Sequence, residues 1–309
     1  WKVTSRYAFT DKVALRGTVS TGFRAPSLQQ QYFQSTSTNF IGGVPYDIVT
    51  FRVNNPAAIA LGSEPLKAEE STNYSLGLVL QPIDSLYITI DGYQIGVDDR
   101  ITLSENLTST AVRNYLNANG FPGVGGGRYF TNAIDTTTTG VDIIGTYTWA
   151  LEASTLDLTF GYNYNKTEID SVTPNPATLT AIDPAAVRFG RVELGRFEVG
   201  APRDKYVLGG KWSVGGFELA TTASRYGEIS VLNADPTRDQ TFGAEWTLDL
   251  SFAYNYENWK FTLGGDNVLN EYPDEVLYAN STFGQLPYSG SAPFGFNGAF
   301  MYATVNYKW

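Results

Sequence analysis

Few residue types in this chain could perform catalysis. Its 309 residues include no histidine and no cysteine, which removes the commonest general base and all thiolate metal sites. A hydrolase that sets a histidine beside Ser or Asp cannot be assembled from these residues. We therefore predict that the protein is not an enzyme and uses no cofactor.

Two local patterns could bind ions. Gly123 and Gly125-Gly126-Gly127 could cradle a phosphate, but no Lys-Ser/Thr pair follows at the spacing of a phosphate-binding loop. We interpret this stretch as a flexible loop. Asp235, Asp239 and Asp98-Asp99 could coordinate calcium through oxygen atoms, although solvated loop carboxylates are the preferred interpretation, and we predict no metal site.

The remaining candidates are aromatic and arginine side chains in or beside long polar connections. Aromatic rings stack on ligands and guanidinium groups pair with anions, so a ferric siderophore or a carbohydrate could bind there. The alternative is that the aromatic residues only pack the loops together. Arg24 has a similar alternative, since it could brace strand and loop. The candidates are Tyr32, Phe33, Tyr46, Phe51, Arg52, Arg128, Tyr129, Arg191, Arg196, Tyr278 and Tyr288.

Long β-strands must position these connections. The last stretch, residues 298–309, alternates apolar and polar side chains and ends on Trp309, which predicts one strand of about eleven residues. The same period recurs in five hairpins. The predicted strands cover residues 1–9 and 13–24, 73–80 and 86–91, 141–149 and 156–164, 206–214 and 217–219, and 246–254 and 261–263.

One long connection contains a predicted helix. Ser109 could cap its N-terminus, Val112, Tyr115 and Leu116 share one face, and Gly120 stands where a helix would end.

Three features favour a transmembrane β-barrel over a soluble β-sandwich. The strands are about ten residues long, whereas strands in soluble sheets usually have five or six. Turns of two to five residues alternate with loops of roughly 15 to 40, as in bacterial barrels. Within the strands, charged residues fall on the polar face, with Arg225 as the exception: Lys2, Arg6, Arg16, Asp91, Asp142, Asp157, Lys211, Glu218, Asp249, Lys260 and Asp266.

Composition agrees with a membrane protein built from strands. The chain is 42% hydrophobic with a mean hydropathy of -0.18, and no apolar run approaches the ~18 residues of a membrane helix. Aromatic residues reach 14%, as interfacial girdles require. The net charge of -10 argues against nucleic acid as a partner.

The strand count predicts that more of the barrel exists. Five hairpins and a final strand make about eleven strands, whereas single-chain barrels normally have an even number. Unpaired edge groups would each cost several kcal/mol in hydrocarbon. We expect residues 1–309 to be the C-terminal part of one barrel domain, mature or truncated before Trp1. With short turns in the periplasm, Trp309 is also periplasmic.

Several motifs resemble those of TonB-dependent outer-membrane receptors. The segment Ser20–Leu28, reading STGFRAPSL, resembles the family's "GFRAP" segment, and Leu66–Tyr74 resembles its "LKPExSxNYE" strand entry, with Ala68 in place of the commoner Pro. Arg128–Ala133 with Gly140-Val141-Asp142, and Asp266–Asn270, are also similar to the family's motifs.

This resemblance implies a barrel of about 22 strands, of which these eleven form the C-terminal half. It also implies a plug domain and a TonB box, both absent from this chain, through which TonB would drive uptake. Val305, Tyr307 and Trp309 resemble the terminal signal read by the barrel-assembly machinery.

The leading functional hypothesis is energised uptake of a scarce ligand, such as an iron chelate, across the bacterial outer membrane, whose lipid contacts the apolar face. Carbohydrate or cobalamin uptake is the alternative within the class. A passive porin and a soluble β-rich adhesin or lectin are the alternatives outside it.

Overall fold

The computed structural model describes residues 1–41, 44–281 and 284–309, and most of its strands join one large antiparallel sheet. These strands are β1 (Lys2–Thr10), β2 (Val13–Arg24), β5 (Glu69–Ile83), β6 (Leu86–Leu103), β8 (Phe130–Ala150), β9 (Ser154–Val172), β10 (Asp204–Val214), β11 (Phe217–Tyr226), β14 (Glu245–Tyr256), β15 (Trp259–Asp266) and β16 (Phe300–Tyr307). They number 11 and are paired in chain order, so the predicted count of eleven is confirmed.

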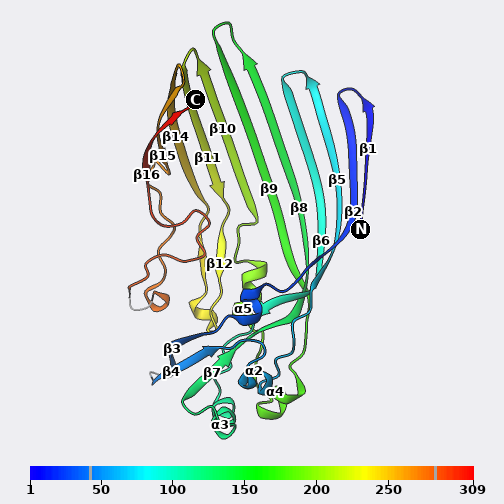
Figure 1. The fold of residues 1–309 in the computed structure, drawn as a ribbon, viewed down its shortest axis with the longest axis vertical. Helices are drawn as coiled ribbons and strands as arrows, with labels where there is room; N and C mark the ends of the chain where they lie inside the picture. Colours follow the sequence, from blue (N-terminus) through cyan, green and yellow to red (C-terminus); the bar gives the residue numbers. More distant parts are fainter. Residues whose placement is uncertain (42–43, 282–283) are drawn as a thin grey trace.

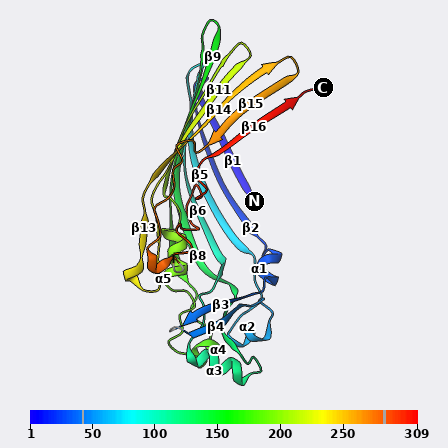
Figure 2. The same cartoon turned by 90° about the vertical axis from the view of Figure 1, so that its left-hand side faces the viewer.

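The sheet is the curved wall of a partial barrel. Its edge strands β1 and β16 both turn toward the same side (Figures 1 and 2). In the described part of the chain they do not pair with each other, so the sheet stays open. Short turns lie at one end of the wall and the long connections at the other (Figure 1).

Several strands differ in length from the prediction; β6, for example, continues to Leu103 and β11 to Tyr226. β8 and β9 have 21 and 19 residues, about twice the nine to eleven that cross a bilayer. Their extensions, including Thr136–Thr139, are polar on both faces and therefore lack the period that marks a half-buried strand, although threonine favours strands. β16 ends at Tyr307, so Trp309 lies beyond the strand.

The convex face of the sheet is apolar and uncovered. Leu250 and Phe252 are 39% and 45% exposed, whereas Asp249 points to the concave side, where its Oδ1 accepts a hydrogen bond from the Asn267 amide at 2.8 Å. The sandwich alternative requires a second sheet against Leu250. Among the described residues no second sheet covers this face.

Aromatic side chains border this apolar band in two rows. Cross-strand register aligns Tyr162, Tyr206 and Trp246 near the loop end and Phe217 with Tyr254 near the short turns. Trp246 and Tyr254 are eight positions apart on β14, which corresponds to about 20 Å along the barrel axis for a tilted strand. This spacing fits the apolar band of an outer-membrane barrel.

The long connections fold into a compact unit at the loop end (Figure 1), which we call the loop body. Its elements are α1 (Leu28–Tyr32), β3 (Ser35–Ile41), β4 (Val44–Thr50), α2 (Pro56–Ala60), α3 (Thr110–Ala118), β7 (Val124–Arg128) and α4 (Ala177–Ile182). A core of buried residues joins β4, α2, α3 and α4, including Leu61, Val112, Leu116, Tyr129 and Leu179, whereas α1 contributes no buried residue. None of the described helices is long and apolar enough to cross a bilayer.

The predicted helix is confirmed as α3. Ser109 is its N-cap, and its Oγ accepts a hydrogen bond from the Val112 amide at 3.2 Å. Gly120 follows the helix with a φ of 91°, a conformation that glycine adopts without strain.

The flexible loop expected at Gly125–Gly127 is wrong, because these glycines form β7. β7 pairs in parallel with β4, and its glycines are buried. A Cβ at Gly127 would overlap the ring of Phe51, and one at Gly125 would overlap Tyr46. The glycines therefore allow close packing.

We expect Leu250→Arg to destabilise the protein in a bilayer by about 2–4 kcal/mol, because Leu250 lies midway between the two aromatic rows on the apolar face. Ser251→Arg is the matched control, since Ser251 is the next residue and faces the concave side. Urea unfolding in lipid vesicles measures both. Equal destabilisation would contradict a lipid-facing convex surface.

Candidate functional site

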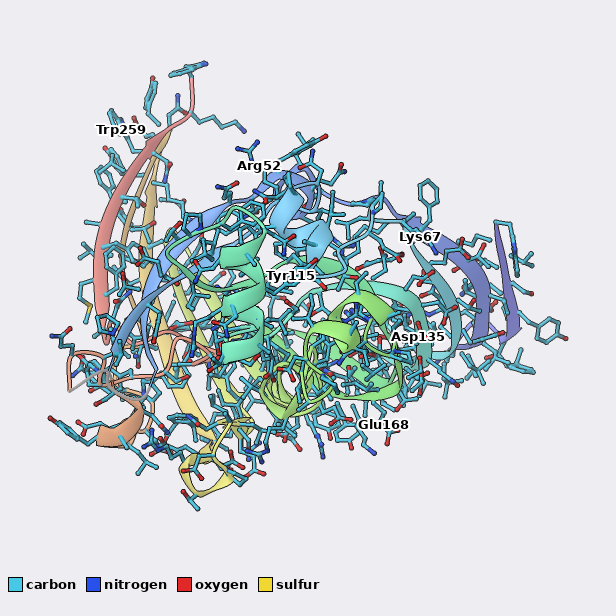
Figure 3. The ribbon with its side chains drawn as sticks, turned by 90° about the horizontal axis from the view of Figure 1, so that it is seen from below. Arg52, Lys67, Tyr115, Asp135, Glu168 and Trp259 are labelled. Carbon is cyan, nitrogen blue, oxygen red and sulfur yellow. The ribbon has the colours of Figure 1, made fainter. Side chains whose placement is uncertain are left out.

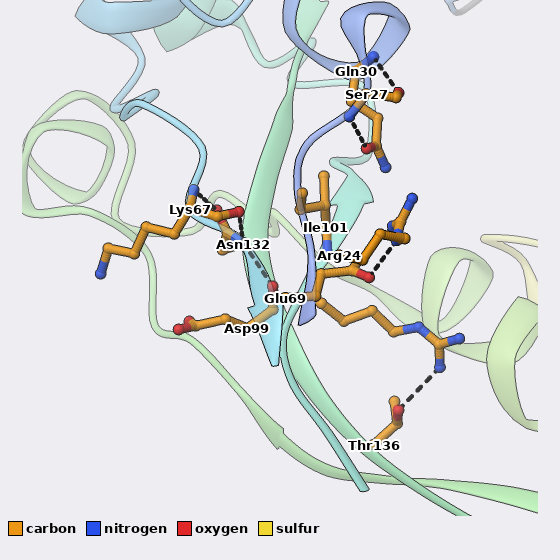
Figure 4. A network of polar contacts seen from close by, with 10 residues as sticks. Arg24, Ser27, Gln30, Lys67, Glu69, Asp99, Ile101, Asn132 and Thr136 are labelled. Carbon is orange, nitrogen blue, oxygen red and sulfur yellow. Dashed lines mark hydrogen bonds and ion pairs between the residues drawn. The ribbon is translucent and has the colours of Figure 1, made fainter. Parts of the chain in front are cut away.

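A partly buried ion pair, which we call the neck, links the wall strands β2 and β5 where they meet the long connections (Figure 4). Arg24 Nε and Nη2 at the end of β2 donate to Glu69 Oε2 and Oε1 at 2.6 and 2.5 Å. The Ile101 amide on β6 donates to Glu69 Oε1 at 2.7 Å. Glu69 is only 6% exposed. The bracing interpretation of Arg24 therefore agrees with the structure.

Asn132 fastens the adjoining loop segments in the same region (Figure 4). Its Oδ1 accepts from the Lys67 amide at 2.8 Å, and its Nδ2 donates to the carbonyls of Lys67 and Asp99 at 3.1 and 2.6 Å. Asp99 has a φ of 54°, which Asp tolerates better than most residues. The motif residues Lys67, Glu69 and Asn132 therefore have a structural role, because their hydrogen bonds connect strand ends and loop segments.

The Asp266–Asn270 motif is structural too. Asn267 donates its side-chain amide to the Glu271 carbonyl at 2.8 Å, and Asn270 Oδ1 accepts from the Ala299 amide at 3.0 Å. These contacts end β15 and fix where β16 begins.

The concave face carries matched polar groups. Arg16 Nε on β2 reaches Asp91 Oδ1 on β6 at 2.8 Å, across the intervening strand β5. Gly77 lies between them in register, and a Cβ there would overlap the Asp91 carboxylate. On the neighbouring strands, Asn163 Nδ2 donates to Asp142 Oδ1 at 2.5 Å. The lumen wall is therefore polar, with its charges paired at Arg16 and Asp91.

Two of the predicted ligand residues lie in the core of the loop body. Phe51 is 4% and Tyr129 is 0% exposed, and the Tyr129 hydroxyl donates to the Leu61 carbonyl at 2.8 Å. Burial raises the pKa of the Tyr129 phenol. Tyr46 is half-buried, with the Arg113 guanidinium 4.7 Å from its ring centroid. For these residues the structure matches the packing alternative.

Three of the predicted residues form an exposed group, which we call the α1 patch. Tyr32 and Phe33 are 54% and 40% exposed. Arg52 Nε donates to Gln34 Oε1 at 3.2 Å, which holds Arg52 beside the end of α1. Arg52 lies on the open side of the curved sheet, whereas Glu168 lies toward the convex side (Figure 3). A cavity of about 240 Å³ adjoins Tyr32.

Arg191, at the start of α5 (Arg191–Glu198), clamps the connection between β11 and β14. Its Nη1 and Nη2 donate to the two carboxylate oxygens of Asp239 at 2.6 Å, and Nη1 also donates to the Asn233 carbonyl at 2.5 Å. The hydrogen bonds from Arg191 and from the Asn233 amide lower the pKa of Asp239 to about 2.

Two of the calcium candidates, Asp235 and Asp239, are engaged by other residues of the protein. Asp235 Oδ1 accepts from the Thr237 amide and hydroxyl at 3.0 and 2.8 Å, and Asp239 is bound by Arg191. Over the described ranges there is no group of three or more acidic side chains that could hold a metal.

Arg128 and Arg196 surround a buried acid. Arg196 Nη1 lies 2.9 Å from Glu193 Oε2, and Arg128 Nε donates to Thr50 Oγ1 at 2.9 Å. Burial raises the pKa of Glu193 and lowers the pKa of Arg128. The Arg196–Glu193 pair lies within α5, the Arg128–Thr50 hydrogen bond joins β7 to β4, and Arg196 remains exposed.

The last two candidates lie in a separate region, the connection between β15 and β16. Tyr278 is 72% exposed. Tyr288 stacks between Tyr272 and Phe296, with ring centroids 5.6 and 6.3 Å away. A groove of about 610 Å³ separates Tyr288 from the hairpin of β12 (Ile229–Val231) and β13 (Gln240–Phe242) and is also lined by Arg238. Sequence reasoning missed Arg238, for which the only signal was its position in a long connection.

Comparisons with known proteins agree with this architecture. The family model described as "TonB dependent receptor-like, beta-barrel" matches residues 1–268. No curated protein sequence matches the chain. Among solved structures, a copper transporter, OprC, has a TM-score of 0.60 at 14% identity, over 99% of this chain and 38% of its own.

Two iron-related structures are similar to a comparable degree. A mutant of the ferric enterobactin receptor PfeA from Pseudomonas aeruginosa has a TM-score of 0.60 at 15% identity, over 99% of this chain and 39% of its own. The FrpB iron transporter from Neisseria meningitidis has 0.58 at 10% identity, over 100% and 39%. The chain therefore spans less than two fifths of the length of these structures.

We expect Glu69→Ala to lower the free energy of unfolding by about 1–3 kcal/mol, because it leaves the buried Ile101 amide without its acceptor. The exposed pair of Lys166 and Glu168, at 2.6 Å, provides the control: Glu168→Ala should cost about 0.5 kcal/mol or less. Urea unfolding gives the energies, and hydrogen exchange of the Ile101 amide gives the local effect. An unchanged Ile101 exchange rate in Glu69→Ala would contradict the role of the neck.

The clamp at Asp239 should persist in acid. Because Arg191 lowers the Asp239 pKa from 3.8 to about 2, its stabilising effect is present above pH ~4 and is lost as the pH falls toward 2. The Asn233 amide donates to Asp239 Oδ1 at 2.9 Å, so its NMR shift should titrate with a midpoint near 2. Asp239→Asn should abolish this titration, and a midpoint near 3.8 would refute the clamp.

Proposed function

From the premise that the chain belongs to the TonB-dependent receptor family, whose barrel model matches residues 1–268, we propose that it forms part of an outer-membrane receptor that imports a ferric siderophore. The observation that carries this proposal is the α1 patch, in which two exposed aromatic rings and a guanidinium adjoin the open side of a polar-lined wall. Such a surface suits a ligand with flat rings and negative charge.

The chemistry of the patch favours an iron chelate. Tyr32 and Phe33 offer ring faces for aromatic or amide groups of a chelator, and Arg52 offers a charge for an anionic complex. Structures with the same fold are named as a ferric enterobactin receptor and a copper transporter, which is compatible with a metal-bearing ligand.

The proposed setting is a single barrel domain in the bacterial outer membrane, with the loop body outside and Trp309 in the periplasm. Upstream strands would close the wall, and a plug with a TonB box would couple it to TonB. Val305 and Tyr307 lie at the end of β16 and Trp309 just beyond it, with 60%, 48% and 100% exposure, accessible to the barrel-assembly machinery. The protein acts as a transporter and not as an enzyme.

A second candidate ligand is a carbohydrate. The stack of Tyr272, Tyr288 and Phe296 beside the groove at Arg238 offers an aromatic platform on which sugar rings can pack. Cobalamin has no specific feature in its favour. A soluble adhesin fits poorly, because Leu263 and Met301 on the convex face are 64% and 65% exposed and would meet water.

Uptake assays test the transport class. The intact protein, expressed in a receptor-deficient bacterial strain, should take up radioactive iron chelates in a saturable manner, and collapse of the proton-motive force should abolish uptake. A panel of catecholate, hydroxamate and citrate chelates covers the main ligand chemistries. Non-saturable uptake that survives collapse of the proton-motive force would identify a porin instead.

Arg52→Ala tests the site. We expect it to weaken binding of the transported chelate about tenfold, the effect of losing one charge-assisted hydrogen bond. Arg113→Ala is the matched control, because Arg113 belongs to the same loop body but is engaged by Tyr46 and by the Thr108 carbonyl at 2.6 Å. Calorimetric titration measures both. Equal losses would move the site away from the α1 patch.

A further inference from the structure

Arg225 is the one basic residue in the loop-end aromatic row of the convex face. Register places it between Tyr206 on β10 and Trp246 on β14. Its guanidinium carbon lies 5.7 Å from the Tyr206 ring centroid, and Nη1 pairs with Asp204. An arginine near the membrane interface costs about 0–1 kcal/mol, far less than at the midplane, so its position is tolerable. The low cost of placing an arginine here does not by itself account for the two cavities that adjoin Arg225.

Two contiguous cavities meet at this ion pair. The cavity nearer the apolar band, of about 610 Å³, runs along the convex face between aromatic and apolar side chains such as Phe160, Tyr162 and Leu208. The cavity nearer the loop end, of about 380 Å³, is polar and is lined by Arg203, Glu228 and Ser230. Both contain Tyr164, Asp204 and Arg225. Together they form an elongated site with an apolar end in the band and a polar end beyond it.

The two guanidinium groups of the loop-side cavity have N–H donors that make no hydrogen bond to a described residue. A guanidinium has five N–H donors, of which Arg225 gives only Nη1 to a described partner. Arg203 gives only Nη2, at 3.4 Å, to the Glu198 carbonyl. Asp204 and Glu228 supply acceptors in the same cavity. Guanidinium donors suit phosphate oxygens, and carboxylates suit hydroxyl groups.

We propose that the convex face around Arg225 binds a phosphorylated glycolipid of the surrounding membrane leaflet. The acyl chains lie along the apolar cavity of about 610 Å³. The phosphate accepts hydrogen bonds from Arg225 and Arg203, and sugar hydroxyls donate to Asp204 and Glu228. In the absence of lipid, Asp204 holds the guanidinium and neutralises it. This proposal rests on the proposed outer-membrane setting, with the loop end outside, and does not depend on which ligand is imported.

The amphiphile is favoured over a protein partner by the shape of the site. Its polar end lies at the loop-side ends of β10 and β11, where Asp204 begins one strand and Tyr226 ends the other. Its apolar end continues into the lipid-facing band between the two aromatic rows. This is the gradient from polar head to acyl chain that a leaflet lipid presents at an interface.

Lipid binding can be measured on the intact protein in detergent. The probes are bisphosphorylated lipid A and the same lipid with its phosphates removed, added at known concentrations and counted by native mass spectrometry. We expect wild-type protein to bind the phosphorylated probe about tenfold more tightly than the dephosphorylated one. Arg225→Gln should remove this preference, in keeping with the loss of one charge-assisted contact.

Lys205→Gln is the matched control. Lys205 neighbours Asp204 but faces the concave side, where its Nζ lies 4.5 Å from the Tyr226 ring centroid. The affinity of the Lys205→Gln protein for the phosphorylated lipid should therefore stay within about twofold of wild type. If Arg225→Gln leaves Asp204 uncompensated and prevents folding, the double variant Asp204→Asn with Arg225→Gln removes both charges. Heat-modifiable migration on gels reports the folded barrel for every variant.

Equal binding of the two probes, or an undiminished preference in folded Arg225→Gln or in the folded double variant, would overturn the proposal. Chelate uptake by Arg225→Gln separates the two functions. Loss of lipid preference with normal uptake supports a lipid site independent of transport. Absence of uptake in wild type refutes the transport proposal and leaves the lipid result to stand on its own.

Discussion

The structure depends on one constraint, which is that each strand of the wall must present one face to hydrocarbon and the other to water. Backbone groups in a bilayer have no water to bond, so neighbouring strands must satisfy them, and the side chains then alternate by necessity. The exposure of Leu250 and Phe252 opposite Asp249 is this constraint in its simplest form. Within the described residues, the edge strands β1 and β16 each pair on one side only.

The polar face obeys a related rule, since charges near a low-dielectric wall require partners. Arg16 meets Asp91 across β5 because Gly77 leaves room between them. At the neck, Glu69 is shared by Arg24 and the Ile101 amide, and this contact joins three strands where the wall gives way to the loops. Beyond that point the long connections pack into a body with its own core.

The sequence was sufficient to predict the wall, because period two is a local signal. It predicted all five hairpins, the final strand and the helix α3, whose cap Ser109 is itself local. It could not predict the loop body, whose contacts join residues far apart, such as Tyr129 and Leu61, separated by 68 positions. Some overlooked elements did leave local traces. Ser27 and Gln30 form a capping box for α1, and Asn55-Pro56 is a typical start for α2.

The candidate site shows why residue type alone selects poorly. Tyr129 and Tyr32 are the same residue type in the same kind of connection, yet Tyr129 is 0% exposed and Tyr32 is 54% exposed. The difference comes from tertiary packing, which no local pattern encodes. Arg225 is the opposite case, because its position in an otherwise apolar alternation was visible in the sequence as a broken rule. Consistency across levels is what a folded sequence normally maintains, and a charged residue that breaks the pattern beside two cavities therefore points more directly to a site than a loop rich in aromatic residues does.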